Sequence, residues 1–261
     1  MKLKLTFLGT GTSGGVPELL CGCAVCRSTD KRNKRLRSSA FLEISDDVQT
    51  TSLIIDTTPD FRQQVLTYGV QRIDAILYTH AHYDHVGGLD DIRPFNRAQG
   101  GVIPAYGNPE TIEILKRRYE YFFNAPQTGG GLPQVDFRTV EAGFRVISAD
   151  ILPLKVLHGK VPILGYKIGK FAYISDASFL PESTLTAIEG LDLLVLNAIR
   201  FKPHPTHFNL EQALAVIGRV KPKKAFLIHI TDAFDHSKVN RSLPENVRLA
   251  YDGQVVNLES V

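Results

Sequence analysis

Short apolar runs, separated by polar and glycine-containing segments, recur along the whole chain. Many of them are rich in valine, isoleucine and phenylalanine, and most are too short for a buried helix, so they predict buried strands. The predicted strands cover residues 3–8, 40–44, 52–55, 73–78, 102–106, 144–147, 151–157, 165–168, 171–174, 191–196 and 225–228.

Helix-start signals lie between several of these strands. Proline in the first helical turn and asparagine at the N-cap favour a helix start, and a following glycine favours its end. The four predicted helices are opened by Thr58 with Pro59, by Asn108 with Pro109, by Pro181 and by Asn209. Strand-rich halves with interspersed helices predict an α/β protein in which two packed sheets are covered by helices.

The overall composition is that of an ordinary globular protein. Hydrophobic residues make up 43% and charged residues 22% of the 261 residues. No linker or repeat divides the chain, so we expect a single domain over residues 1–261. The net charge of +3 permits a phosphorylated substrate without requiring nucleic acid. No apolar stretch is long enough for a signal sequence or a membrane span, which predicts a cytoplasmic protein without membrane partners.

Residues 80–85 read His-Ala-His-Tyr-Asp-His and follow a predicted strand. Imidazoles and a carboxylate at this density suit zinc, manganese or iron, whereas an exposed polar loop seldom gathers them. His80, His82, Asp84 and His85 are therefore predicted metal ligands. With Gly87-Gly88 allowing a close turn, Asp84 and His85 are expected to face a second ion.

Three further donors stand just beyond predicted buried strands. His158 follows residues 151–157, Asp176 follows residues 171–174 by one residue, and His229 follows residues 225–228. A single histidine at such a place is often structural, but three donors in equivalent places predict one shared centre.

All three cysteines lie together as Cys21, Cys23 and Cys26. An odd number of clustered cysteines argues against disulfides and for a zinc site that needs one more donor. The nearby Gly9-x-Gly11-x-x-Gly14 matches a dinucleotide fingerprint, yet no helix pattern follows it. We interpret these glycines as a tight turn near the site.

Two further segments allow more than one interpretation. Residues 31–37 hold five positive charges, which favours a solvated loop, although such a run could also hold a phosphate or an RNA backbone. Residues 119–132 are aromatic at first and then contain Gly129-Gly130-Gly131. They fit either a flap beside the site or a packed aromatic corner.

The HxHxDH pattern of residues 80–85 resembles the signature of the metallo-β-lactamase superfamily. Within it, the chain is most similar to the PhnP-type phosphodiesterases, which share the opening Thr-Gly-Thr-Ser-Gly-Gly-Val-Pro of residues 10–17, the CxCxxC pattern and a late histidine before an Asn-Leu helix start. This resemblance implies a four-layer αββα sandwich with two divalent ions, Zn²⁺ or Mn²⁺, at the edge between the sheets.

The resemblance also implies a role for each donor. His80, His82 and His158 would hold one ion, Asp84, His85 and His229 the other, and Asp176 would bridge both. A water shared by the ions would be acidified into a hydroxide nucleophile, with Asp84 holding the second ion and the nucleophile.

Outside the ligands, His207 resembles the family's late histidine and is expected to bind the phosphate or protonate the leaving oxygen. His204 is assigned no role. Asp56 ends a predicted strand and either orients a ligand imidazole or caps the following turn.

The cysteine site departs from the related pattern. In PhnP-like proteins a histidine three residues after the last metal histidine completes this site, but here Asp232 stands in that place. The fourth ligand of the expected structural Zn²⁺ is therefore Asp232 or, if the loop folds back, His236.

The leading hypothesis is a metal-dependent phosphodiesterase for a small phosphorylated substrate, such as a cyclic phosphate of ribose. An RNase Z-like tRNA 3′-processing nuclease is the main alternative, but it would need a long basic arm that is not visible here. A thioester or lactam hydrolase and a non-hydrolytic PqqB-like protein of cofactor biosynthesis are weaker alternatives. Relatives of this kind are commonly homodimers, and we expect the same here.

Overall fold

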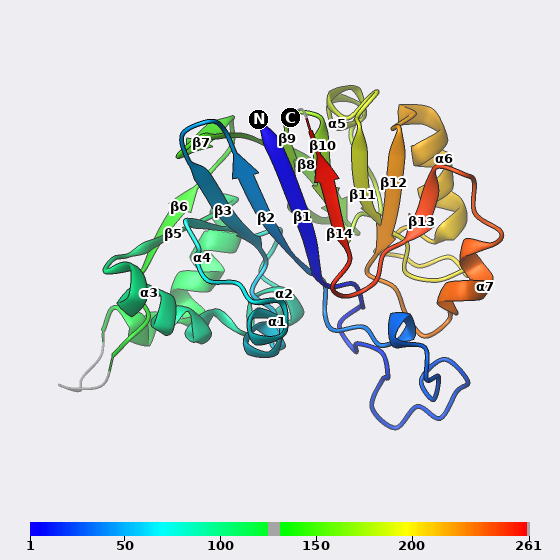
Figure 1. Ribbon diagram of the computed structural model, residues 1–261, viewed down its shortest axis with the longest axis horizontal. Helices are drawn as coiled ribbons and strands as arrows, with labels where there is room; N and C mark the ends of the chain where they lie inside the picture. The colour runs from blue at the N-terminus through cyan, green and yellow to red at the C-terminus, as the bar shows by residue number, and fades with distance from the viewer. Residues whose placement is uncertain (125–130, 260–261) are drawn as a thin grey trace.

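Two seven-stranded β-sheets lie face to face in the computed structural model, which describes residues 1–124 and 131–259 (Figure 1). The first sheet has the strand order β14-β1-β2-β3-β4-β5-β6 and the second β13-β12-β11-β10-β9-β8-β7. Helices α1 to α4 cover the outer face of the first sheet, and α5 to α7 cover that of the second. The predicted four-layer αββα sandwich is confirmed.

The strands of the first sheet are β1 (Lys2–Gly9), β2 (Ser39–Ser45), β3 (Thr50–Ile55), β4 (Ala75–Leu77), β5 (Ile103–Gly107), β6 (Val135–Thr139) and β14 (Val255–Leu258). Those of the second are β7 (Phe144–Val146), β8 (Ala149–His158), β9 (Val161–Ile168), β10 (Phe171–Ile174), β11 (Leu193–Asn197), β12 (Lys224–Ile228) and β13 (Val247–Leu249). The α-helices are α1 (Phe61–Tyr68), α2 (Tyr83–Val86), α3 (Arg93–Gln99), α4 (Pro109–Arg118), α5 (Glu182–Ala187), α6 (Leu210–Val220) and α7 (His236–Asn240).

The two sheets share one topology. In the first, β1, β2 and β3 pair antiparallel and β3 to β6 pair parallel. In the second, β8, β9 and β10 pair antiparallel and β10 to β13 pair parallel. The carboxyl ends of the parallel strands therefore lie at one edge in each half, where side chains beyond the strands can meet.

Three apolar layers hold the sandwich together. One lies between the sheets and includes Phe7, Tyr166 and Phe171; the other two lie between each sheet and its helices. Hydrogen bonds also cross between the sheets. The Tyr166 hydroxyl donates to the Tyr78 carbonyl at 2.7 Å, and the Leu164 N–H donates to the Thr79 carbonyl at 2.9 Å.

The four predicted helices are confirmed, with shorter bounds for the helix at Pro181. Asn108 caps α4, and Asn209 forms a capping box with Gln212 at α6. Strands β6, β13 and β14 and helices α2, α3 and α7 are absent from the prediction. Strand β14 alternates between exposed and partly buried positions, and its sequence does not contain the continuous apolar run that marks a buried strand. None of the described helices is long and apolar enough to cross a bilayer.

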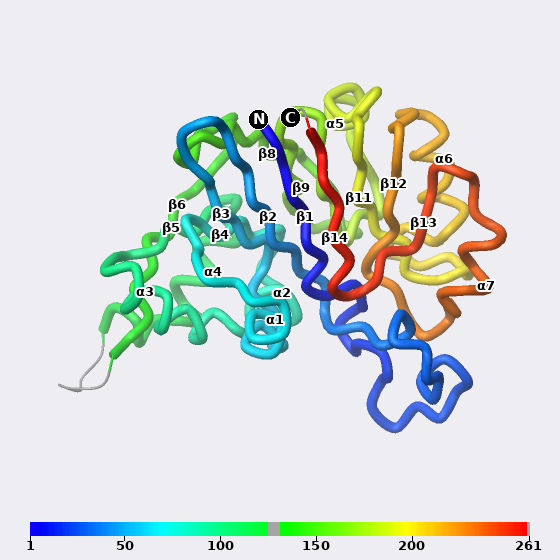
Figure 2. The backbone as a smooth tube through the Cα atoms, viewed as in Figure 1, coloured from blue at the N-terminus to red at the C-terminus, as the bar shows by residue number. Residues whose placement is uncertain are grey.

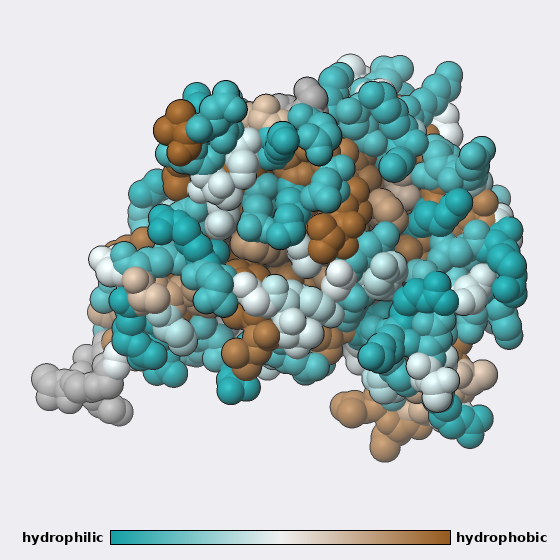
Figure 3. Space-filling model, viewed as in Figure 1, coloured by the Kyte–Doolittle hydropathy of each residue, from teal (hydrophilic) through white to brown (hydrophobic). Residues whose placement is uncertain are grey.

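Residues 10–38, between β1 and β2, form an arm that extends from the sandwich (Figure 2, blue). The tip of this arm is apolar in Figure 3, and Leu19 and Leu20 are fully exposed or nearly so. At its base, a Cβ on Gly9 would lie 2.0 Å from the Arg37 carbonyl oxygen. The glycines thus let β1 approach the returning chain at Arg35–Arg37. The same turn lies beside the predicted metal ligand His229, because the Ile230 N–H donates to the Thr10 carbonyl at 3.0 Å, so the prediction that this turn brings backbone close to the site is confirmed.

The basic run at residues 31–37 is not a free cationic surface. Arg35 is only 2% exposed and donates to backbone carbonyls of Thr231 and Phe234. Arg37 pairs with Asp60 at 2.9 Å. The run is therefore held largely by the protein itself, and both the solvated-loop and the phosphate-binding interpretations are wrong for Arg35.

The aromatic segment after α4 is a packed corner in its first part. Tyr119 and Phe122 are buried in the layer under α1 to α4, and the Tyr119 hydroxyl donates to the Val86 carbonyl at 2.5 Å. Tyr121 and Phe123 are exposed. The expected flap at the glycines falls mostly on residues 125–130, which lie outside the described residues.

Candidate active site and cysteine cluster

The predicted donors meet at the edge of the sandwich where strands of both sheets end. His80 and His82 come after β4, and Asp84 and His85 lie on the short helix α2. His158 ends β8, Asp176 follows β10, and His229 directly follows β12. Donors separated by up to 149 positions thus share one site.

The first group of donors joins the two sheets. Ring nitrogens of His80, His82 and His158 all lie within 4.8 Å of one another. His80 Nε2 and His82 Nδ1 are 2.9 Å apart. His82 is exposed while the other two are buried, so this group opens to solvent on one side.

The second group is formed by Asp84, His85 and His229, whose ligand atoms also lie within 4.8 Å. His85 Nε2 is 3.3 Å from Oδ2 of Asp84 and 3.3 Å from Oδ2 of Asp176. The other oxygen of Asp176, Oδ1, is 3.1 Å from His229 Nε2. Asp176 also belongs to a donor group with His80 and His85, so it lies between the two groups, where a bridging ligand would be needed.

Asp56 holds the His85 ring from behind. Its Oδ2 is 2.7 Å from His85 Nδ1, and its two oxygens accept from the backbone N–H and the hydroxyl of Thr79 at 2.8 and 2.7 Å. By accepting a hydrogen bond from the Nδ1–H of His85, Asp56 favours the tautomer in which Nε2 is available to bind a cation. Asp56 therefore orients a ligand imidazole, one of the two roles expected from the sequence.

His158 and His207 are fixed by the loop before α6. His158 Nδ1 donates to the Thr206 carbonyl at 2.7 Å. His207 is largely buried; its Nε2 donates to Asp176 Oδ1 at 3.0 Å, and its Nδ1 lies 3.1 Å from Nδ1 of His204. The loop thus orients one predicted ligand and brings His207 against another.

Burial and charge set the protonation states that metal ligands require. Burial lowers the pKa of His229 to about 4 and that of His80 well below its usual range, so both imidazoles are neutral. Burial alone would raise the pKa of Asp176, but its contacts with the neighbouring histidines, His229, His85 and His207, outweigh burial and hold the pKa well below normal.

Negative charge is concentrated at His85. Burial opposes a charge there, but Asp176, Asp84 and Asp56 together raise the pKa of His85 well above its usual value. Three carboxylates converging on one imidazole create an environment that a divalent cation neutralises well.

The donor set fits a pair of divalent ions. His85 Nε2 is buried and has no hydrogen-bond partner among the described residues, yet it faces two carboxylates. Neutral imidazole nitrogens with carboxylate oxygens suit zinc or manganese. The residues that would hold the ions are His80, His82, His158, Asp84, His85, His229 and Asp176.

Three of the residues at this centre have left-handed backbone. The φ angles are +61° at Asp56, +59° at Asp176 and +55° at His229. This region is unfavourable for residues other than glycine and persists when the surroundings fix it. Each of the three directly follows a strand or lies one residue beyond it, so the backbone turns sharply to direct the side chain into the site.

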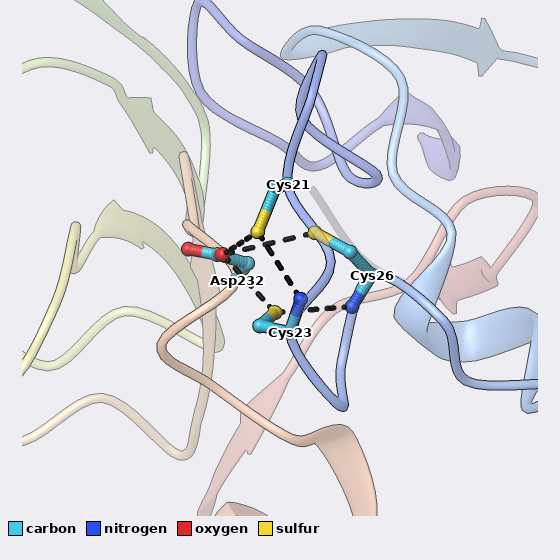
Figure 4. A group of neighbouring side chains, drawn as sticks. All are labelled: Cys21, Cys23, Cys26 and Asp232. Carbon is cyan, nitrogen blue, oxygen red and sulfur yellow. Dashed lines mark hydrogen bonds between the residues drawn. The ribbon is translucent and has the colours of Figure 1, made fainter.

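The three cysteines and Asp232 form a separate cluster of donors, apart from the two histidine and aspartate groups (Figure 4). Asp232 Oδ2 lies 3.1, 3.2 and 3.7 Å from Sγ of Cys21, Cys23 and Cys26. A tetrahedral zinc with ordinary Zn–S and Zn–O bonds separates its sulfur and oxygen ligands by roughly 3.5 Å. The four side chains therefore fit one structural Zn²⁺.

His236 is not part of this cluster. It is buried, its backbone N–H donates to Asn33 Oδ1 at 2.8 Å, and its ring packs edge-on against Tyr251. Between the two fourth ligands left open by the sequence, the structure places Asp232 at the cysteines.

Two residues that hold the donors in place were not identified in the sequence analysis. Thr79 binds Asp56, and the Thr206 carbonyl binds His158. Thr79 directly precedes His80, so its place beside the motif was a usable signal. The Thr206 contact uses a backbone carbonyl and leaves no trace in side-chain type.

The fold and the site are those of metal-binding αββα proteins. A comparison of the sequence with known families identifies the family. Residues 51–230 match the family described as "Beta-lactamase superfamily domain", and the chain belongs to this superfamily.

The structure is similar to a crystal structure described as a new diphosphatase from the PhnP family, with 40% identity, a TM-score of 0.91, and coverage of 100% of this chain and 98% of the other. Zn²⁺-bound PqqB from Methylobacterium extorquens has a TM-score of 0.78 at 19% identity, covering 98% and 100%. Human tRNase Z, short form, has a TM-score of 0.66 at 18% identity, covering 97% and 98%. The latter two show the shared fold alone. The expected similarity to PhnP-type proteins is confirmed, and it supports a hydrolase.

Among curated proteins, the chain is 37% identical over 254 residues to an octanoyltransferase from Porphyromonas gingivalis. The match covers 96% of this chain but 51% of that protein, so the chain spans about half its length. Coenzyme PQQ synthesis protein B from Rhodopseudomonas palustris is 31% identical over 124 residues, 44% of this chain and 38% of the other.

Proposed function

We propose that this protein is a metal-dependent hydrolase that cleaves a phosphodiester or diphosphate linkage in a small phosphorylated substrate. The observation that carries the proposal is the donor set itself. Two groups of imidazoles and carboxylates meet at Asp176, and His207 reaches the same carboxylate at 3.0 Å. Cleavage of a phosphorus ester needs charge neutralisation on several oxygens at once, which a pair of cations held in this way provides.

Two bound divalent metal ions, Zn²⁺ or Mn²⁺, would neutralise the phosphoryl oxygens and lower the pKa of the attacking water. The chain's own residues supply the rest. Asp56 and the Thr206 carbonyl accept from Nδ1 of His85 and of His158, so each ring is oriented with Nε2 as the nitrogen that a cation would bind. Asp84 is only partly buried and is the proposed holder of an incoming water. His207, with its Nε2 proton directed into the site, is the proposed donor to the leaving oxygen.

The similarity to a PhnP-family diphosphatase over the whole chain supports this class of substrate, and it adds diphosphates to the cyclic ribose phosphates expected from the sequence. The likeness to tRNase Z is at 18% identity and does not favour tRNA. Because Arg35 is buried, this cation of the basic run is also unavailable to an RNA-facing surface.

The octanoyltransferase similarity favours one further test substrate. That name belongs to a protein about twice as long, so it does not by itself describe the half that this chain matches. An acyl thioester hydrolase, already a weaker alternative on sequence grounds, is nevertheless worth measuring directly.

One panel of substrates separates these functions. Protein loaded with Mn²⁺ or Zn²⁺ is assayed with bis-p-nitrophenyl phosphate, a ribose cyclic phosphate, a nucleoside diphosphate sugar, a precursor tRNA and an octanoyl thioester. We expect the highest kcat/KM with one of the small phosphorus esters. Higher kcat/KM with precursor tRNA or with the thioester would overturn the proposal.

Light scattering on the same sample tests the proposed homodimer. A mass of one chain, 28.9 kDa, would contradict it.

A further inference from the structure

The buried guanidinium of Arg35 has no ionic partner among the described residues. Its nitrogens donate to the carbonyls of Thr231 and Phe234 at 3.1 and 2.7 Å and to Oδ1 of Asn33 at 3.1 Å, all of them neutral acceptors. The Nε of Arg35 also has no hydrogen-bond partner among the residues that the structure describes. A charge buried without a counter-charge is strongly unfavourable, so its environment must contain negative charge that is not in direct contact.

The carboxylates that stabilise the Arg35 charge from a distance include Asp252, Asp235 and Asp232, and Asp232 belongs to the cysteine cluster. Thr231, whose carbonyl accepts from Arg35, directly precedes Asp232. On the other side, Nζ of the neighbouring Lys34 donates to the Cys26 carbonyl at 2.8 Å. Two consecutive cations of the basic run therefore contact both chain segments that supply ligands to the cysteine site.

The formal charges of the four ligands, a divalent ion and the two contacting cations add up to zero. Three thiolates and one carboxylate carry four negative charges, and a divalent ion cancels two of them. The two charges that remain match Lys34 and Arg35. A histidine in place of Asp232 would leave a single negative charge, so the aspartate creates a need for one cation more.

Hydrogen bonds from backbone N–H groups within the cysteine segment also stabilise the thiolate form of the cysteines. The backbone N–H of Cys23 lies 3.5 Å from Sγ of Cys21, and that of Cys26 lies 3.3 Å from Sγ of Cys23. Donors directed at sulfur stabilise negative charge on it.

We propose that Lys34 and Arg35 are the counter-cations of the cysteine site and set its affinity for a divalent ion. The basic run thereby acquires a role in metal retention at a centre separate from the proposed hydrolytic one, and the proposal does not depend on the reaction catalysed.

Cobalt binding tests this directly, because Co²⁺ bound to thiolates gives a charge-transfer absorption that imidazole and carboxylate ligands lack. The apo protein is titrated with Co²⁺ in competition with a chelator, and the thiolate band reports the cysteine site alone. Lys34→Gln is expected to weaken binding about tenfold and Arg35→Gln more, as removal of one charge near an anionic cluster in a medium of intermediate dielectric predicts. Lys31→Gln, an exposed lysine of the same run, is the matched control and should bind as the wild type does.

A second comparison keeps the proposal falsifiable if Arg35→Gln does not fold. In an Asp232→His background the site carries one negative charge less, so Lys34→Gln should weaken Co²⁺ binding by a clearly smaller factor than in the wild type. Equal factors in the two backgrounds would overturn the proposal. So would wild-type affinity in Lys34→Gln, or a wild-type protein that shows no thiolate band at saturating Co²⁺.

Discussion

Replacing Asp56 by asparagine should weaken the second metal group without touching any ligand. Asp56 is fully buried and is 2.7 Å from His85 Nδ1, and its other oxygen accepts from the Thr79 backbone N–H. An asparagine that keeps the Thr79 contact must present its amide group to His85. Nδ1 then has to accept, and the ring proton moves to Nε2, the nitrogen that faces Asp84 and Asp176.

The size of this effect follows from one charge-assisted hydrogen bond. Such a bond contributes about 1.5–3 kcal/mol, and each 1.4 kcal/mol corresponds to a factor of about ten in affinity. The dissociation constant of the more weakly held ion should therefore rise about 10- to 100-fold, as is usual when the partner of a metal-binding histidine is lost. The folded state should remain, because asparagine has almost the same shape.

Chelator competition on the Asp56→Asn protein, with metal counted by mass spectrometry, measures this change. Asp136→Asn is the matched control, because Asp136 is exposed and pairs only with Arg138 on the surface. Thermal unfolding of both apo proteins shows whether folding is affected. If Asp56→Asn retained both ions with wild-type affinity, the tautomer argument would be refuted.

Three further changes test other parts of the site. Asp84→Ala should remove one of the two active-site ions and nearly all turnover; full turnover with one ion lost would contradict its role. His207→Ala should lower kcat by about 10²- to 10⁴-fold with metal content unchanged, and parallel loss of metal would show that it is a ligand. Asp252 is partly buried and accepts from the Thr10 hydroxyl and the Leu36 N–H, and its removal from water raises its pKa to about 7. Because the folded state then binds this proton more tightly than the unfolded state, stability falls as pH rises from about 4 to 7, by up to about 4 kcal/mol. Asp252→Asn should reduce this fall in urea unfolding; an unchanged pH profile would show that the carboxyl is ionised at neutral pH.

Most of the site could be predicted from the sequence because its donors are local or stand beyond buried strands. Four of them fall within residues 80–85, and His158, Asp176 and His229 follow clear apolar runs. Strand ends at one sheet edge bring such positions together whatever the loops between them do. The four main helices were equally accessible, because proline or asparagine stands at the N-cap or just before it in each.

The remainder depends on contacts between distant segments. A run of five cations looks solvated in sequence, and nothing in residues 31–37 alone indicates that Arg35 lies under the turn at Thr231. The choice between Asp232 and His236 likewise depended on how that turn meets the arm. Strand β14 escaped prediction because it is an edge strand with alternating partial exposure, which gives little apolar signal.

The hydrogen bonds from Tyr166 to Tyr78 and from Leu164 to Thr79 end two residues and one residue before His80, respectively. The two sheets are thus joined next to the donors by one backbone–backbone hydrogen bond and one bond from a buried tyrosine hydroxyl, in addition to the apolar packing between them. A cavity made in the central layer would accordingly separate the donors of the two sheets only after these hydrogen bonds break. Loops around the site can then vary in length and composition while the donors keep their spacing.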